Sequence, residues 1–469
     1  MALLCGAATV DITPEVGGQM DGYGYRRAGS QGIADRLKAS VVVFEATRSA
    51  GASGGAGGGG GQRVAIVAAD VIGFPESLAG PTRDRIAAAL GVVRERVMLT
   101  ATHTHAGPAA GILKDRPVDD RYWEGVRERI AGAARRAVQA LQPVVIAAGT
   151  GSVAFPVNRR DAVRRAAGNP TPGPVDRSVR LLAAVGTGTG RPVAVVAHAS
   201  CHPVTLGPTH HLISADFPAG LYERLAGLGV PVLFVNGSAA DINPNRLEGE
   251  SEMERRDRCG AELARTAEAI LERALEQVGG TGTPSATWRS PEHASAGDAV
   301  IHCKEISLRL PLEELPGPER LEEEIRRLEA ELETANDPGR HVTERRLGWT
   351  REALRLRSAF PGPLWLDAAI QAIRVGGCAF LGLPFEVFTA TGLAILEAFP
   401  AERDRIFIAG YTNGAYGYLT PRYVLEEGGY EADSAYFWYG MPNRYAPEAE
   451  EIVRTEAVRL LREIVRDVP

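Results

Sequence analysis

The chain has 469 residues, of which 45% are hydrophobic and 23% charged, so it can bury a full core and is not a largely disordered protein. Its formal net charge is -6 and no long stretch is purely basic, which excludes nucleic acid as a partner. The two longest uncharged stretches, Pro192–Ala215 and Ala137–Asn158, are interrupted by prolines, so neither predicts a transmembrane segment.

The N-terminus predicts a protein that is not exported. It has no basic region and reaches Asp11 before an apolar run of secretory length can form. The five cysteines are an odd number, widely spread and without a C-x-x-C pair, which favours reduced thiols. We therefore expect a cytoplasmic location, although a secreted protein whose signal peptide has been removed would look the same.

Apolar, β-branched runs alternate with amphipathic helical patterns through most of the chain, which predicts the α/β class. Several of the predicted strands end directly in polar or ionisable residues, where open α/β sheets place their sites. The predicted strands are Ala39–Glu45, Val64–Ala69, Val97–Ala101, Val144–Ala148, Val179–Val185, Val193–Ala197, Val232–Asn236, Val300–Leu308 and Ala372–Leu381.

Two segments stand apart from this alternation. Residues 51–62 are glycine-rich and predict a flexible surface loop; because a strand follows rather than a helix, a phosphate-binding loop is a poor interpretation. Residues 313–360 are charge-rich with leucines at helical spacing around a turn, which predicts a helical hairpin insertion. The hairpin is either a solvated helix pair or a cover over an active site.

The strongest chemical pattern is Thr102–Pro108, directly after a predicted strand. In an extended segment residues two apart point the same way, so His103 and His105 can face one site. H-x-H at a strand end is a common metal-ligand arrangement, although one of the two imidazoles could instead make only a core hydrogen bond.

A second histidine cluster follows the strand Val193–Ala197. His198 and His202 are four residues apart, but the strand and Pro203 argue against a helix that would align them. We expect only one of the two to be a ligand. Imidazoles combined with a carboxylate and an open position make a catalytic zinc site. Glu386 is the candidate carboxylate, or else an acid that the dipole favours in the first turn of a helix.

Two further stretches are polar or aromatic. Asn236–Asn245 is a loop of small residues at another strand end, which suits close approach to a ligand but is also explained by turn formation. Gly410–Gly440 holds seven tyrosines, a cluster more typical of packing or an interface than of catalysis.

In order along the chain, these segments resemble the catalytic domain of the neutral/alkaline (non-lysosomal) ceramidase family, zinc amidases that cleave the N-acyl bond of ceramide. The resemblance rests on short motifs, of which the HTHAGP run is the most specific. The matching segments are Gly6–Pro14, Gly22–Gly24, Gln31–Leu37, Thr102–Pro108, Asn158–Arg159, Cys201–Thr205, Pro384–Thr389, Asn413–Thr420 and Gly429–Glu431.

The resemblance implies a role for each matching residue. It makes His103, His202, Glu386 and Tyr418 ligands of Zn²⁺. It places His105 beside the metal as a carbonyl or proton-transfer partner. It also brings Arg159 and Tyr430 into the active site, where a neutral phenol can donate to a developing oxyanion.

The chain departs from the family at three points. Ala34 replaces a histidine of the family's early segment. Asn243 stands where the family has a serine implicated in catalysis; an amide is no hydroxyl nucleophile, but it can bind a substrate or a water. The chain shows no C-terminal β-rich domain, so one neutral ceramidase-like domain with mixed sheets flanked by helices is expected over 1–469.

The sequence therefore predicts a zinc-dependent hydrolase. The favoured function is an amidase that cleaves the N-acyl bond of a ceramide-like or other soluble, small-molecule or lipid-like substrate with zinc-activated water. The alternatives are a hydrolase of an ester, lactam or sugar derivative on the same scaffold, or a non-catalytic zinc-stabilised binding protein.

Overall fold

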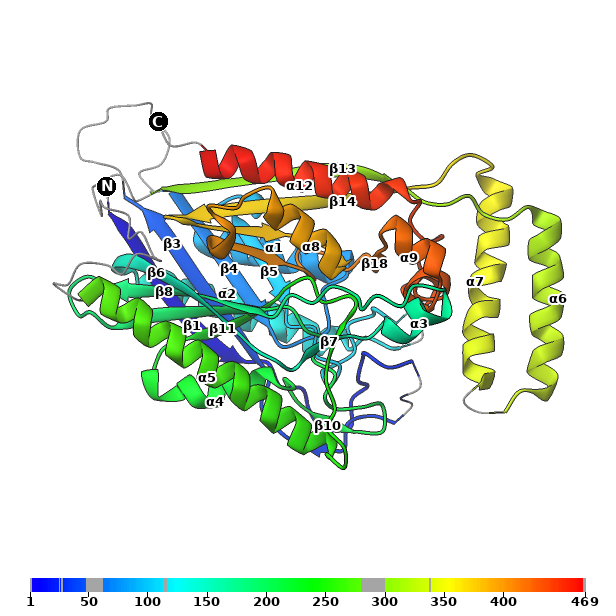
Figure 1. Ribbon diagram of the computed structural model, residues 1–469, viewed down its shortest axis with the longest axis horizontal. Helices are drawn as coiled ribbons and strands as arrows, with labels where there is room; N and C mark the ends of the chain where they lie inside the picture. Colours follow the sequence, from blue (N-terminus) through cyan, green and yellow to red (C-terminus); the bar gives the residue numbers. More distant parts are fainter. Residues whose placement is uncertain are drawn as a thin grey trace.

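The computed structural model describes residues 2–24, 26, 28–47, 62–113, 116–279, 300–336 and 339–466. The predicted glycine-rich loop, apart from Gln62, lies outside the described residues. The structure has the mixed α/β architecture that the sequence predicts (Figure 1).

The larger sheet has eight strands in the order β11-β9-β8-β6-β1-β3-β4-β5. Its pairs are antiparallel except β4–β5 and β9–β11, so the sheet is mixed. The strands are β1 (Leu3–Asp11), β3 (Lys38–Ala46), β4 (Gln62–Ala69), β5 (Val97–Ala101), β6 (Gln142–Ser152), β8 (Ser178–Gly186), β9 (Pro192–Ala199) and β11 (Val232–Asn236).

The smaller sheet has four strands, β13 (Ile301–Pro311), β14 (Trp365–Val375), β15 (Cys378–Gly382) and β17 (Ile406–Ala409). The prediction of one strand over Ala372–Leu381 is wrong, because the chain reverses at Gly376-Gly377 and β14 pairs antiparallel with β15. Gly376 has φ +55°, a left-handed turn conformation that glycine adopts without steric cost.

The two sheets pack face to face, and helices cover both outer faces (Figure 1). In β3, Val42 and Phe44 point into the core between the sheets, whereas Val41 and Val43 pack under the helices. Because both faces of the strand are buried, its sequence is continuously apolar rather than alternating.

Helices α1 (Glu76–Leu90), α2 (Asp120–Gln139), α4 (Pro218–Arg224) and α5 (Glu252–Gly279) cover the larger sheet. Helices α8 (Thr389–Glu397) and α12 (Glu448–Arg466) cover the smaller one. The buried residues of α12, Ala449, Val453, Ala457, Leu460, Leu461 and Ile464, recur with the helical period and so form one apolar face.

The remaining elements lie around the ends of the sheets. Three two-stranded pairs are β2 (Gly32–Ile33) with β10 (Leu212–Ile213), β7 (Pro156–Asn158) with β12 (Ile242–Pro244), and β16 (Glu386–Val387) with β18 (Tyr418–Leu419). The other helices are α3 (Asp161–Ala166), α6 (Pro318–Thr334), α7 (Gly339–Ala359), α9 (Arg422–Glu427), α10 (Tyr430–Asp433) and α11 (Ala435–Trp438), with short 3₁₀ turns at Arg94–Arg96, Leu225–Leu228 and Arg403–Arg405.

The segment 313–360 holds α6 and α7, which lie against each other at one end of the molecule (Figure 1). Ion pairs join the helices, Arg346 with Glu324 and Arg351 with Glu329. Within the described part of the chain, every helix is too short or too polar to span a lipid bilayer.

Candidate functional site

Three buried or half-buried histidines meet beyond the ends of β5 and β9. The nearest ring nitrogens of His103, His105 and His202 all lie within 4.8 Å of one another, a spacing that can hold a metal ion. Nε2 of His103 lies 3.2 Å from Nε2 of His105. The two histidine motifs, about a hundred residues apart in the sequence, thus form one site.

His103 does not have the extended backbone that the sequence predicts. Its φ is +69°, in the left-handed region that non-glycine residues rarely adopt, and its backbone N–H donates to the carbonyl of Val71 at 2.9 Å. Strain of this kind persists where the surrounding structure enforces it, often at functional sites. His103 and His105 therefore face one site, but through a turn rather than through strand alternation.

Of the second histidine pair, only His202 reaches this site. His198 lies within β9, and its Nε2 bonds the carbonyl oxygen of Ile408 at 2.9 Å. His202 lies beyond the strand, and its backbone N–H donates to Ile242 on β12 at 3.0 Å. This placement agrees with the expectation that one of the two imidazoles is available to a metal.

Glu386 supplies the carboxylate. Its Oε2 lies 3.0 Å from Nε2 of His202 and 3.7 Å from Nε2 of His103. The residue lies on β16, paired with Tyr418 of β18, and α8 begins only at Thr389. Glu386 is therefore not a first-turn helix acid, and its carboxylate points at the histidines.

The hydrogen bonds of the two imidazoles leave bare lone pairs facing Glu386. Nδ1 of His103 donates to the carbonyl of Ile72, and Nδ1 of His202 to that of Ala239, both at 2.6 Å. A neutral ring that donates from Nδ1 presents an unprotonated Nε2. Backbone carbonyls in this position orient metal-binding histidines in the same way.

Burial keeps these imidazoles neutral. It lowers the pKa of His103 to about 4 and that of His202 to about 3, so neither ring takes up a second proton and becomes positively charged at pH 7. Among the described residues, no donor reaches Nε2 of His202 or Oε2 of Glu386. Converging lone pairs in a buried pocket repel one another unless a cation lies between them, so this donor set fits a metal such as zinc.

His105 is held differently. Its Nδ1 is buried and has no hydrogen-bond partner within the described ranges, so no backbone carbonyl fixes its tautomer. Arg26 is buried and donates to the His105 carbonyl at 2.7 Å. Gly22, at φ +103°, lies so close that a β-carbon there would be 2.6 Å from Cβ of His105. The backbone of His105 is fixed while its Nδ1 stays available for proton transfer.

Arg159 and the tyrosines form the opposite side of the site. Arg159 Nη2 donates to the hydroxyl of Tyr418 at 3.0 Å, and its Nε donates to Glu431 at 3.0 Å. Tyr430 is 45% exposed, and its ring centroid lies 5.8 Å from that of Tyr418. Arg159, Tyr418 and Tyr430 are thus brought together, with Tyr430 at the solvent side.

Asn243 lies on β12, opposite Val157 of β7. Its side-chain oxygen is buried and has no hydrogen-bond partner in the described part of the chain. Because the preceding residue, Ile242, accepts the backbone N–H of His202, Asn243 belongs to the strand that supports the second histidine.

Sequence reasoning missed Asn236, which joins the two histidine loops. Its Nδ2 donates to the carbonyl of Thr102 at 3.1 Å, and its Oδ1 accepts from the N–H of Cys201 at 3.3 Å. Thr102 and Cys201 immediately precede His103 and His202. The sequence feature that could have indicated this role is an Asn at the end of an apolar strand. The Asn-Gly-Ser sequence is, however, equally typical of a turn.

Three other residues at the site lie in segments that the sequence analysis singled out, but it gave none of them a role of its own. Tyr411 stacks on His103 with ring centroids 3.9 Å apart. Glu431 pairs with both Arg159 and Arg160; burial acts to raise the pKa of Glu431, but the two guanidinium groups outweigh it and hold that pKa below its usual range. The hydroxyl of Tyr439 donates to Oε1 of Glu386.

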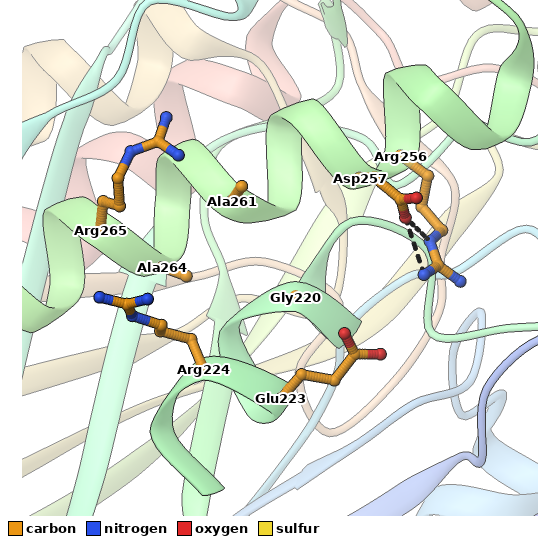
Figure 2. A pocket seen from close by; sticks show the side chains of 8 residues that line it. All are labelled: Gly220, Glu223, Arg224, Arg256, Asp257, Ala261, Ala264 and Arg265. Carbon is orange, nitrogen blue, oxygen red and sulfur yellow. Dashed lines mark hydrogen bonds and ion pairs between the residues drawn. The ribbon is translucent and has the colours of Figure 1, made fainter. Parts of the chain in front are cut away.

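A surface cavity of about 460 Å³ lies elsewhere, between α4 and α5 (Figure 2). Arg224, Arg256 and Arg265 rim it over a floor of small residues. It shares no residue with the histidine site. Arg224 and Arg256 are already paired, with Glu268 and Asp35, so we assign this cavity no part in the chemistry.

No protein-family model and no curated protein sequence matches the chain. Among solved structures, a neutral ceramidase from Pseudomonas aeruginosa superposes with a TM-score of 0.69 at 21% identity, covering 100% of this chain and 75% of its own. A ceramidase complexed with C2 gives a TM-score of 0.68 at 20% identity, covering 99% and 76%. The chain therefore has the neutral ceramidase fold, as the resemblance of its motifs predicts.

Proposed function

We propose that this protein is a zinc-dependent hydrolase, and that it is an amidase cleaving the N-acyl bond of a ceramide-like or other soluble N-acyl substrate. The observation that carries the proposal is the convergence of the unprotonated Nε2 atoms of His103 and His202 on Oε2 of Glu386. The neutral ceramidase fold supports the choice of bond.

His103, His202 and Glu386 are the proposed metal ligands, with Tyr418 as the fourth. Two neutral imidazoles, a carboxylate and a phenol oxygen suit Zn²⁺. A zinc ion bound there would supply Lewis-acid activation of a water and of the scissile carbonyl. Arg159, which donates to the hydroxyl of Tyr418, favours an oxygen with anionic character at that position.

His105, Arg159 and Tyr430 are the proposed catalytic residues. His105 has a buried Nδ1 without a fixed partner, so its ring can accept a proton at one nitrogen and release it to the leaving amine. Arg159 contributes a guanidinium and Tyr430 a phenol, both beside Tyr418. Donors placed there stabilise negative charge that develops on the carbonyl oxygen.

Asn243 replaces a hydroxyl nucleophile, so the proposed reaction uses water. The buried, unpartnered side-chain oxygen of Asn243 can accept a hydrogen bond from the substrate amide or from a water. This substitution also favours a second candidate function, hydrolysis of an ester, lactam or sugar derivative on the same scaffold.

The absence of disulfides among Cys5, Cys201, Cys259, Cys303 and Cys378 supports a cytoplasmic location.

The test is fatty-acid release from a short-chain ceramide analogue by protein whose zinc content has been measured. Release that is lost in His103→Ala supports the amidase. If zinc-loaded protein leaves this analogue and a panel of small N-acyl amines intact but hydrolyses an ester or lactam, the second function replaces the first. A protein with tightly bound zinc that turns over neither class would overturn both.

A further inference from the structure

Tyr439 connects the carboxylate of the candidate metal site to the outer helices. It follows α11 directly and belongs to none of the motifs that resemble the ceramidase family. Its ring packs against three apolar clusters: the one beneath the larger sheet, the one beneath the smaller sheet, and a small one around Phe388 and Val424. A side chain with so many neighbours has little rotational freedom.

The hydroxyl of Tyr439 donates to Oε1 of Glu386. The other oxygen of that carboxylate, Oε2, is the one that faces His202 and His103. Because Oε1 is engaged, the carboxylate cannot rotate without breaking this bond.

The backbone leaves room for the tyrosine ring. Gly417 has φ +69°, and a β-carbon there would lie 3.4 Å from Cγ of Tyr439 and 2.9 Å from Sδ of Met441. The residue after Gly417 is Tyr418, whose strand pairs with that of Glu386. The same turn that delivers Tyr418 to the site therefore accommodates Tyr439.

Helix α7 holds the segment that carries Tyr439. Trp349 Nε1 donates to the carbonyl of Met441 at 2.8 Å, and Arg345 donates to the carbonyl of Phe437 at 2.9 Å. Val342 and Trp349 of α7 pack on Phe437 and Trp438. These contacts fall on both sides of Tyr439, so the hairpin braces this segment from outside.

We propose that Tyr439 is a positioning residue: its hydroxyl turns Glu386 so that a single carboxylate oxygen faces the metal, and α7 holds Tyr439 in that place. This inference rests on the proposed metal site. Under this proposal the helical hairpin supports metal binding, a role distinct from covering the substrate.

The experiment measures zinc affinity of the full chain by competition with a chromophoric chelator. In Tyr439→Phe, which keeps the ring and removes the hydroxyl, we expect affinity to fall by about 10–100-fold, the usual effect of losing a partner of a metal ligand. The matched control is Tyr416→Phe, whose hydroxyl bonds Glu76 away from the site. Trp349→Phe, which removes one brace, should weaken binding by about two- to tenfold.

A second readout is the visible absorption of the cobalt-substituted protein, which reports ligand geometry. Its band positions should shift in Tyr439→Phe and stay in place in Tyr416→Phe. If the parent binds zinc and Tyr439→Phe binds it equally well with an unchanged cobalt spectrum, the inference is wrong while the proposed function stands. A parent protein that binds no zinc would overturn the proposed function and this inference with it.

Discussion

The two sides of the site are built in different ways. The histidine side consists of loops that leave β5 and β9, and backbone groups fix it: the carbonyls of Ile72 and Ala239 hold the imidazoles of His103 and His202. The tyrosine side consists of short elements after β17. Charged side chains hold it, through a buried chain of ion pairs from Arg159 over Glu431 to Arg160.

The difference separates metal binding from substrate handling. Backbone carbonyls cannot be exchanged by mutation and vary little in position, which suits a ligand set that must keep its geometry. Ion pairs between long side chains can be tuned residue by residue. We therefore expect changes on the histidine side to remove the metal, and changes to the ion-paired residues Arg159 and Glu431 to slow the reaction while metal is retained.

The largest effect is expected for His202→Ala. Removing a ligand should weaken zinc binding by more than the roughly 100-fold that loss of a supporting partner causes, and should abolish turnover. Zinc content after dialysis and hydrolysis of the chosen substrate measure both. His210→Ala is the control, because His210 lies beside Glu252 outside the site. Retained turnover in His202→Ala would contradict the assignment of metal binding to the histidine side.

In contrast to His202→Ala, Arg159→Gln should slow turnover while zinc stays bound. Loss of a donor aimed at developing charge lowers kcat by about 10²–10³-fold, while zinc content at saturating metal stays near one ion per chain. Arg164→Gln is the matched control, because Arg164 pairs with Glu427 and makes no contact with Tyr418 that the structure records. Loss of zinc in Arg159→Gln would mean that the two sides are not separable.

Asn236→Ala tests whether one side chain holds the two histidine loops together. The substitution leaves the Thr102 carbonyl and the Cys201 N–H without their partner in a buried place, which costs about 1–3 kcal/mol of unfolding free energy. Urea denaturation of the metal-free protein measures it. Asn169→Ala, which changes a turn, should stay within about 0.5 kcal/mol. Equal stabilities of the two variants would count against a bridging role.

The sequence predicts β5 with its exact bounds and predicts β9 approximately, because both depend on local patterns; β9 extends to Ala199 and so contains His198, which the sequence places after the strand. Apolar runs mark β5 and β9, and the polar residues that follow them reach the site. It does not predict Asn236 or Tyr439 as parts of the site, since their partners are 134 and 53 residues away and only tertiary packing joins them.

Local reasoning also failed where the backbone turns. The left-handed conformation of His103 has no sequence signal, because histidine adopts it only when its surroundings enforce it. The reversal at Gly376-Gly377 had a signal, a glycine pair, which the apolar residues on either side obscured. The metal-ligand and catalytic roles of the site residues remain predictions that the variants above decide.

Asp70, beneath the histidine side, gives a smaller effect that depends on pH. It follows β4, accepts the backbone N–H of Lys38 at 2.8 Å and the hydroxyl of Tyr222 at 2.9 Å, and burial raises its pKa to about 7. In the unfolded chain the same carboxyl ionises near pH 4. Between these values the folded state binds one proton more than the unfolded state, so stability falls as pH rises.

Asp70→Asn removes this dependence while keeping an acceptor for the Lys38 N–H; the Tyr222 hydroxyl, which donates to Asp70 Oδ1 in the parent, can instead accept from the new amide N–H. The variant should therefore gain stability relative to the parent by about 1 kcal/mol per pH unit from pH 4 to pH 7, and no further above that. Urea denaturation of both metal-free proteins across this range measures the difference. A constant difference would show that Asp70 is ionised in the fold. A buried charged side chain would then support the histidine side as well. The two sides of the site would differ less in how they are held.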